Sequence, residues 1–353
     1  MSRKRDLIKK TKRYAKLGIM PRMKKDIKRI AIVRLSALGD IVNSAVTLQF
    51  IHEKYPDSKI EWITEEVFAP LLQNHPLISA VHTLNLKELK KSKSFSLLKC
   101  TISKLRSLGT FDIIIDIQGL LKSAVVARFL GANTHGFDKN SAREGLSSLF
   151  YRTTSHIEYD ENIVKRNTFL VSDGLGFKID DIMLKSKKPV FETTLYPLEE
   201  NDKKNIAIVI GASWQSKKYP KEKVLQLCNE LKENVIILWG SGVEREDALW
   251  ISENSAYASV APKLSLVDLV SLISSVDLLI GNDTGPTHMA WAQNIPSITL
   301  FGPTTTRMIY ETSINIGIKS SSIVDIYHID KNDFSIKDIP VHDITREAKE
   351  LLK

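Results

Sequence analysis

Cysteines and long apolar stretches are scarce in this sequence of 353 residues. The two cysteines, Cys100 and Cys228, each lie in a segment of helical pattern, and we expect two free, buried thiols of a reducing compartment. No run of 18 or more uncharged apolar residues is present, which excludes a membrane-spanning helix. The first residues lack the apolar core and cleavage site of a secretory signal, so the sequence predicts a cytoplasmic protein.

Two signatures of nucleotide sites are also missing. The loop at residues 36–40, after the first expected strand, contains only Gly39 and therefore no G-x-G-x-x-G, which argues against an NAD-dependent oxidoreductase. The sequence also has no D-x-D, which disfavours an enzyme that holds a diphosphate through a chelated metal ion. We therefore expect neither a bound metal ion nor a cofactor.

Basic charge is concentrated at one end of the chain. The formal net charge is +9, but residues 1–29 carry 13 Lys and Arg against two acidic residues, and the remainder is close to neutral. Plotted as a helix, this tail places Leu7, Ile8 and Tyr14 opposite its lysines, a weakly amphipathic pattern that suits an anionic membrane surface. A disordered, solvated arm is the alternative. RNA binding is disfavoured because the tail has one aromatic residue and no RNA-binding fold follows it.

From residue 29 onward, short β-branched stretches alternate with helical ones, which predicts βαβ units and mostly parallel sheets. The alternation pauses where Pro189 and Pro197 interrupt a polar stretch, and then it restarts. We expect an α/β protein with two Rossmann-like, doubly wound domains that face a central cleft. The expected parts are a basic N-terminal extension (1–28), an N-terminal domain (29–176), a linker (177–204), a C-terminal domain (205–340) and a final helix (341–353).

The elements expected within this plan follow from the pattern of apolar residues. Strands are expected at 29–35, 59–64, 80–84, 112–117, 205–210, 235–239, 277–280 and 297–301. The helices include 40–54, 95–108, 120–130, 141–150, 158–175, 221–232, 244–254, 265–275, 286–293 and 345–352.

Ligands of open α/β sheets bind beyond the carboxyl ends of the strands, so the loops after strands form the candidate site. The loop at 36–40 carries Asp40, which can act as a general base in a cleft or simply cap the following helix. The loop at 283–288 offers a Gly-Pro helix start, a Thr hydroxyl and His288, which suit a diphosphate. Ordinary caps and a packed histidine would produce the same pattern.

Two further loops lie in the second half of the chain. Residues 211–218 contain Ser213 and two adjacent lysines, of which Lys217 can neutralise a departing diphosphate. The alternative is that the two lysines are solvated on a surface loop and have no role in binding. Residues 240–244 contain two glycines and Glu244, which can accept from ribose hydroxyls or merely begin a helix. Because three of the four loops belong to the second half, we expect the C-terminal domain to bind a nucleotide and the N-terminal domain to supply the acceptor site and the base.

Five stretches together resemble the ADP-heptose glycosyltransferases of bacterial lipopolysaccharide synthesis, glycosyltransferase family 9. They are IAIVRLSALGD (30–40), IDIQGLLKSAVVAR (115–128), SAREGLSSLFYR (141–152), SWQSKKYP (213–220) and NDTGPTHMA (282–290). The second and third are similar to the heptosyltransferase I branch of the family. The resemblance covers roughly residues 29–350.

The resemblance implies a GT-B enzyme that transfers L-glycero-D-manno-heptose from ADP-heptose to a 3-deoxy-octulosonic acid (Kdo) residue of lipid A-Kdo2. It implies inversion of the anomeric centre, no metal ion, and work at the cytoplasmic face of the inner membrane. It assigns the catalytic base to Asp40. It assigns donor binding to Ser213, Lys217, Glu244, Asp283, Thr284, Gly285 and His288. It assigns acceptor binding to Ser36, Gly39, Lys87, Lys90, Lys91, Lys122 and Arg143.

The sequence departs from the family pattern in two places. The basic extension is additional, and Ala212-Ser213 stands where pairs of hydroxyl residues are common. Three alternatives stay open: heptosyltransferase II or another ADP-sugar core glycosyltransferase, a GT-B nucleotide-sugar epimerase, and a non-catalytic nucleotide- or RNA-binding protein.

Overall fold

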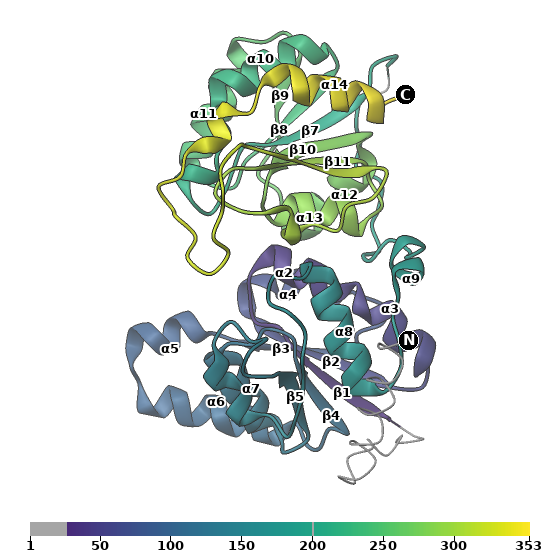
Figure 1. Ribbon diagram of the computed structural model, residues 1–353, viewed down its shortest axis with the longest axis vertical. Helices are drawn as coiled ribbons and strands as arrows, with labels where there is room; N and C mark the ends of the chain where they lie inside the picture. The colour runs from purple at the N-terminus through teal and green to yellow at the C-terminus, as the bar shows by residue number, and fades with distance from the viewer. Residues whose placement is uncertain (1–26, 200) are drawn as a thin grey trace, which may run out of the picture.

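The computed structural model describes residues 27–199 and 201–353, which form two α/β domains stacked end to end (Figure 1). The first domain and the segment that follows it contain the elements β1 (Arg29–Val33), α2 (Leu38–Ala45), α3 (Thr47–Lys54), β2 (Lys59–Glu65), η1 (Glu66–Phe68), α4 (Ala69–Gln73), β3 (Ala80–Leu84), α5 (Leu86–Ser92), α6 (Phe95–Ser107), β4 (Ile113–Asp116), α7 (Leu121–Leu130), β5 (Thr134–Phe137), η2 (Gly145–Phe150), β6 (Thr153–Ser155), α8 (Ile163–Leu175) and α9 (Asp181–Lys185). Residues 1–26 of the expected extension lie outside the described residues.

The second domain repeats the alternation. Its elements are β7 (Asn205–Val209), η3 (Gln215–Lys217), α10 (Lys221–Leu231), β8 (Asn234–Leu238), α11 (Gly242–Glu253), β9 (Ala258–Val260), α12 (Leu266–Ser275), β10 (Leu278–Asn282), α13 (Gly285–Ala292), β11 (Ser297–Phe301), η4 (Thr306–Met308), β12 (Asn315–Lys319), η5 (Ser335–Asp338) and α14 (Val341–Leu351). Helix α14 packs on α10 of the same domain, where Thr345 Oγ1 donates to Glu230 at 2.8 Å.

Each domain holds one six-stranded sheet. The strand orders are β3-β2-β1-β4-β5-β6 and β12-β11-β10-β7-β8-β9. The paired strands are parallel, in register Ile30↔Ile60 on one side of β1 and Ile30↔Ile113 on the other. Four consecutive residues of β1, Ile30 to Val33, are fully buried, because helices cover both faces of a parallel sheet. The predicted class, two doubly wound α/β domains, is confirmed.

Several expected elements differ from the observed ones. The helix expected at 40–54 begins earlier, at Leu38, and divides at Val46, where Ser44 and Thr47 hydroxyls donate to main-chain carbonyls one turn back. Of the helix expected at 141–150, only the 3-10 turn η2 forms, since Asp138 accepts from the Ser141 N–H at 2.8 Å and holds a turn there. Helix α8 begins at its cap Asn162, not at residue 158.

The sequence patterns missed four strands: β5, β6, β9 and β12. They have three to five residues and interrupt their apolar positions with Gly, His, Ser or Thr, so their hydrophobic signal is weak. Cys228 is buried as predicted, but Cys100 is exposed, which corrects the prediction of two buried thiols. Its helix, α6, fully buries only Leu105.

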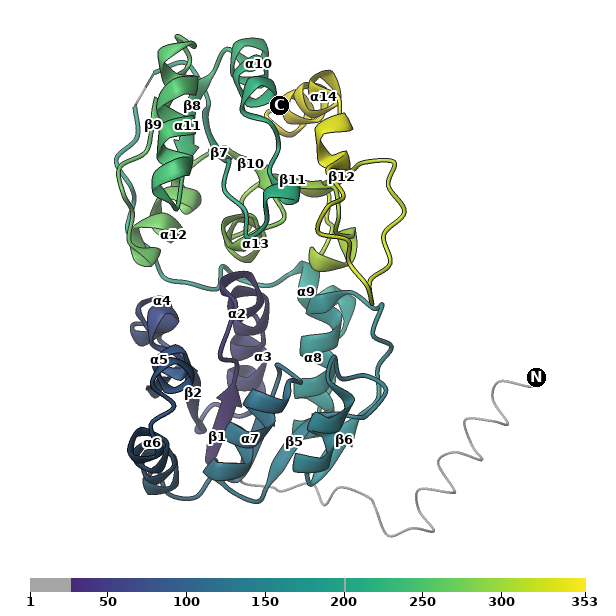
Figure 2. The ribbon, with the colours of Figure 1, turned by 90° about the vertical axis from the view of Figure 1, so that its left-hand side faces the viewer.

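The two domains meet where α2 packs against α13, one above the other in both views (Figures 1 and 2). A Cβ added to Gly39 would lie 2.3 Å from Cδ2 of His288, and one added to Gly285 would lie 2.6 Å from Cδ2 of Leu38. Each helix therefore has, in its first turn, a glycine that the other helix covers. The absence of two side chains lets the first turns of both helices touch.

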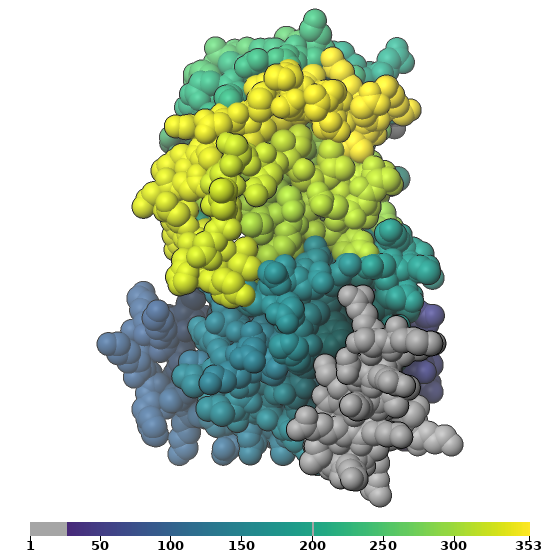
Figure 3. Space-filling model, in the orientation of Figure 1, coloured from purple at the N-terminus to yellow at the C-terminus, as the bar shows by residue number. Residues whose placement is uncertain are grey.

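Other contacts brace the same arrangement. Asn162 Nδ2 donates to the carbonyls of Arg307 at 3.2 Å and Ile309 at 2.5 Å. The Tyr159 ring stacks on Tyr327 with 5.3 Å between centroids, and the two domains are in broad contact on the face shown in Figure 3. On the segment between the domains, buried Lys187 donates to Ala292 O, at the end of α13, at 2.9 Å.

Replacing Gly39 by alanine should push the domains apart without unfolding either one. The added Cβ would overlap the buried His288 ring, and overpacking of this kind costs about 1–3 kcal/mol. We expect a larger radius of gyration in small-angle X-ray scattering and a lower free energy of unfolding. Gly242→Ala is the matched control, because a Cβ at this first residue of α11 meets nothing within 4 Å. An unchanged radius for Gly39→Ala would contradict the close contact.

Candidate functional site

All four predicted loops contribute to one cavity between the domains. Its volume is about 610 Å³, within the range of small-molecule sites. Gly39 and Asp40 enter it from the N-terminal domain. The C-terminal domain contributes the predicted donor residues Ser213, Lys217, Glu244, Asp283, Thr284, Gly285 and His288. The remaining wall is largely apolar and includes Leu238, Leu264, Leu266 and Leu269.

Asp40 is the carboxylate that the N-terminal domain presents to this cavity. It is the third residue of α2 and accepts from the Ala37 N–H at 3.3 Å, so it does stabilise the start of the helix. Its other oxygen lies 2.8 Å from Nη2 of Arg34, a buried residue that also donates to Ile117 O. The two interpretations of Asp40 are therefore compatible, since a capping carboxylate still lines the cleft. The sequence pattern did not identify Arg34 as a residue of the site. A single arginine within an apolar stretch is the sequence feature that could have indicated it.

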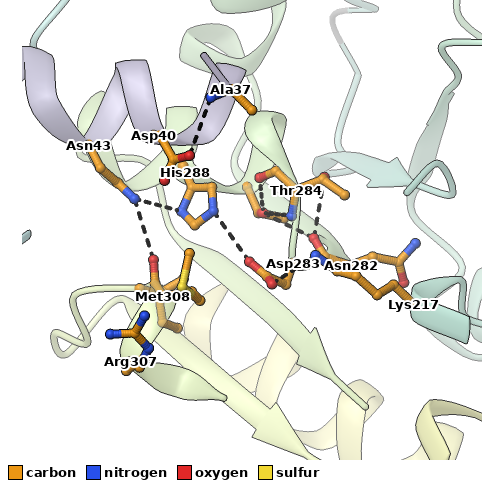
Figure 4. A network of polar contacts seen from close by, with 12 residues as sticks. Ala37, Asp40, Asn43, Lys217, Asn282, Asp283, Thr284, His288, Arg307 and Met308 are labelled. Atoms are coloured by element: carbon orange, nitrogen blue, oxygen red, sulfur yellow. Dashed lines mark hydrogen bonds and ion pairs between the residues drawn. The ribbon is translucent and has the colours of Figure 1, made fainter. Parts of the chain in front are cut away.

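The centre of the C-terminal side is a buried network around Asp283 (Figure 4). Lys217 Nζ donates to Oδ2 of Asp283 at 2.9 Å, and His288 Nε2 lies 3.3 Å from Oδ1. Burial alone would raise the pKa of Asp283, but the hydrogen bond from His288 and the charge of Lys217 outweigh it and lower that pKa. The carboxylate stays ionised and holds the lysine and the histidine at the cavity wall.

Asn43 reaches this network from the other domain. Its side-chain nitrogen lies 3.4 Å from Nδ1 of His288 and also donates to Met308 O at 3.4 Å. No sequence pattern indicates this contact, because Asn43 and His288 are 245 residues apart. Asn282 was missed as well: it is fully buried, accepts from Tyr219 N–H and donates to Gly211 O, which ties the lysine loop to β10.

Glu244 combines a cap with an ion pair. Its Oε2 accepts from the Gly240 N–H at 2.9 Å and the Ser241 N–H at 3.1 Å, and its Oε1 lies 2.9 Å from Lys218 Nζ. Burial raises the pKa of Glu244, but Lys218 and these amides outweigh it, so the pKa is lowered. The two adjacent lysines therefore have different partners: Lys217 contacts Asp283 and Lys218 contacts Glu244. Ser213 is exposed at the cavity.

The residues expected to bind the acceptor fall into two groups. Lys122 Nζ lies 3.2 Å from both Ser36 Oγ and Oε1 of the buried Glu65, which places these three side chains beside the Asp40 loop. The second group is exposed and away from the cavity wall. It consists of Lys87, Lys90 and Lys91, one helical turn apart on α5, and Arg143, in the turn before η2.

Within residues 27–199 and 201–353, no group of three or more His, Cys, Asp and Glu side chains is arranged to hold a metal ion. Among the helices of this same part of the chain, none has the length and apolar character to cross a membrane.

The model of glycosyltransferase family 9 (heptosyltransferase) matches residues 102–326, and the chain is 40% identical to lipopolysaccharide heptosyltransferase 1 of Campylobacter coli over 92% of its own length and 98% of the relative's. The protein belongs to glycosyltransferase family 9. This family 9 member is therefore an enzyme of the glycosyltransferase class, as the motifs predicted.

Solved structures agree on the fold. E. coli heptosyltransferase WaaC with ADP superposes with a TM-score of 0.76 at 24% identity, covering 92% of this chain and 99% of that one. The same enzyme with ADP-2-deoxy-2-fluoro heptose gives the same score over 91% and 99%. The glycosyltransferase described here therefore has the GT-B fold, as the resemblance implied.

Asp283→Asn should destabilise the enzyme by about 3–5 kcal/mol at pH 7, because Lys217 would lose its buried partner. The pKa of Asp283 is lowered in the folded state, so its contribution is present above the ordinary carboxyl range and is lost as the pH falls toward the folded-state value. Urea unfolding at pH 7, 4 and 3 should show the difference from wild type shrinking below about pH 4.

The exposed pair Lys221–Asp247 provides the control for this experiment. It has a similar length, 2.8 Å, but both side chains are more than a third exposed. Asp247→Asn should cost less than about 1 kcal/mol. If Asp283→Asn changed stability equally at every pH, a charge effect would not explain its cost.

Proposed function

We propose that this glycosyltransferase transfers L-glycero-D-manno-heptose from ADP-heptose to a Kdo residue of lipid A-Kdo2. The observation that carries the proposal is that one cavity joins Asp40 of the N-terminal domain to the Lys217–Asp283–His288 network of the C-terminal domain. Relatives named lipopolysaccharide heptosyltransferase 1, and solved relatives with ADP and an ADP-heptose analogue, support the choice of donor and pathway.

The C-terminal wall suits ADP-heptose in both shape and charge. The apolar side chains of Leu264, Leu266 and Leu269 offer a surface for the adenine ring. Glu244 would accept from ribose hydroxyls. The first turn of α13 and the Lys217 ammonium would meet the diphosphate, together with Ser213, Thr284 and Gly285 at the cavity wall.

In the proposed reaction, Asp40 takes the proton of an acceptor hydroxyl while that oxygen attacks the anomeric carbon. The bond from this carbon to the diphosphate breaks, its electron pair goes to the departing ADP, and the configuration inverts in a single displacement. A carboxylate is a weak base, so proton removal accompanies bond formation. The rate enhancement then comes from holding the two substrates in line and from stabilising the charge on ADP.

The proposed mechanism uses neither a metal ion nor a cofactor. Asp283, the buried carboxylate of the donor wall, already has both oxygens engaged, one by Lys217 and the other by His288. To bind a cation it would have to release them. Positive charge for the diphosphate is supplied instead by Lys217 and the start of α13.

The acceptor is anionic, and the N-terminal domain carries basic groups suited to it. Lys122 and Ser36 lie next to the Asp40 loop, and we propose that they contact the sugar acid directly. Lys87, Lys90, Lys91 and Arg143 lie farther out and would attract carboxylates and phosphates of the lipid. Acceptor binding by Gly39 would be through its main chain, because a side chain there would strike His288.

We further propose that the enzyme works as a peripheral protein on the cytoplasmic face of the inner membrane. The basic tail would supply attraction to anionic lipids. Helices α5 and α6 project from the N-terminal domain (Figures 1 and 3) and add exposed lysines beside Phe95, whose ring is 79% exposed. Nucleic acid is not a proposed partner.

Asp40→Asn should lower turnover with ADP-heptose and lipid A-Kdo2 by about 10²–10⁴-fold, the usual contribution of a general base. Calorimetric binding of ADP should change little, since the donor wall belongs to the other domain. The exposed carboxylate Asp57 supplies the control variant Asp57→Asn, which should keep wild-type turnover. Turnover by Asp40→Asn near the wild-type rate would refute the assigned base.

The acceptor is tested separately with wild-type enzyme and a panel of core acceptors. We expect transfer to lipid A-Kdo2 and no release of free or epimerised sugar without an acceptor. Transfer only to a heptosylated core would favour heptosyltransferase II, and product without acceptor would favour an epimerase. Binding of RNA without any transfer would favour the non-catalytic alternative.

Removing residues 1–28 should weaken binding to vesicles that contain anionic lipid, because 12 of the chain's basic residues would be lost. Turnover on detergent-dispersed acceptor should stay at the wild-type level. Co-sedimentation with anionic and with neutral vesicles measures the first effect. Equal sedimentation of both proteins with anionic vesicles would show that the tail is not a membrane anchor.

A further inference from the structure

His288 is contacted by both domains at once. Its Nε2 lies 3.3 Å from Oδ1 of Asp283, in its own domain, and its Nδ1 lies 3.4 Å from Nδ2 of Asn43, which belongs to α2. Both His288 and Asn43 are buried, at 4% and 1% exposure. Figure 4 shows the imidazole between the amide and the carboxylate, with Asp40 beside it.

The contact with Asn43 fixes where the proton of a neutral His288 resides. The same Nδ2 that faces the ring also donates to Met308 O, and a flipped amide would set two oxygens against each other there. An amide nitrogen only donates, so Nδ1 of His288 must accept. The proton of the neutral ring is therefore on Nε2, where it is donated to Asp283.

Asn43 lies three residues after Asp40 on α2, and positions three apart occupy the same face of a helix. When α2 seats against α13, the carboxylate and the amide therefore arrive together. The amide sets the His288 tautomer, His288 donates to Asp283, and Asp283 holds Lys217. A hydrogen-bonded chain thus runs from the helix of the base to the lysine of the donor wall.

We propose that Asn43 is a positioning residue that couples the seating of α2 to the donor site by fixing the tautomer of His288. The inference rests on the proposed roles of Asp40 and Lys217. Among the described residues, the charged groups beside the ring are Asp283, from the loop between β10 and α13, and Asp40, from α2. Asp40 is paired with Arg34, and Lys217, from η3, acts through Asp283.

A second interdomain amide, Asn162, provides a matched control. Its Nδ2 donates to the carbonyls of Arg307 and Ile309, on either side of the Met308 carbonyl that Asn43 contacts, and not to His288. Its Oδ1 caps α8, a role that an aspartate keeps. Asn43→Asp and Asn162→Asp therefore remove the same kind of donor and add the same charge, and they differ in whether His288 is affected.

The test uses the full-length enzyme with ¹⁵N-labelled histidine. The variant His288→Gln identifies the His288 signals among the eight histidines. At pH 8 we expect the proton on Nε2 and none on Nδ1 in wild type and in Asn162→Asp, because Asn43 donates to Nδ1 in both. In Asn43→Asp we expect Nδ1 to carry the proton at pH 8, because a carboxylate oxygen at position 43 can only accept from it.

Kinetics supply the second readout. For Asn43→Asp, kcat should fall by about tenfold or more at pH 8 and recover in part at pH 6, where the imidazolium satisfies both carboxylates. Asn162→Asp should keep the shape of the wild-type pH profile. A wild-type tautomer in Asn43→Asp, or the same altered profile in both variants, would overturn the inference. If wild type shows no heptosyl transfer, the proposed function fails, while the histidine signals still decide the tautomer.

Discussion

The arrangement of this enzyme depends on the contact between the first turns of α2 and α13. Gly39 and Gly285 leave no Cβ where the opposite helix presses, so the two helix starts meet directly across the cleft. Both helices begin at carboxyl ends of central strands, β1 and β10, where α/β sheets place their ligands. The contact therefore brings the active edges of two separate sheets together. Larger residues at either position would separate Asp40 from the donor wall.

Electrostatics at this contact are arranged before any substrate arrives. Asp283 is buried yet ionised because Lys217 and His288 each satisfy one oxygen, and Asn43 satisfies the far side of His288. Groups that are held in this way would need no reorganisation when charge develops on the diphosphate in the proposed reaction. The cost of burying charge is offset inside the network, and the network is complete only when α2 is in place.

The sequence was sufficient for the fold class and for most of the cavity wall, but not for the partners of its residues. Strands such as β1 can be predicted from their unbroken runs of apolar residues. By contrast, β6 and β9 have three residues each, too few for a recognisable alternation of apolar and polar residues. Asp40, Lys217, Glu244 and Asp283 were found because loops after strands are where ligands bind. Asn43, Arg34 and Glu65 were missed because their roles arise from contacts between distant segments. The sequence likewise could not show that Lys218, and not Lys217, pairs with Glu244, because this depends on how the two loops fold against each other.

The same geometry explains why one enzyme needs two domains for a single displacement. An activated sugar is vulnerable to water, and a site that assembled its base and donor groups on one rigid sheet would stay open to solvent. Here the proposed base, Asp40, lies on α2 and the proposed donor-binding groups lie on the opposite domain, so the site is complete only while α2 and α13 are in contact. In this contact Gly39 lies against His288 and Asn43 lies against the same ring, both on the helix that carries Asp40. The helix contact that completes the proposed site therefore also joins the two domains at the cavity.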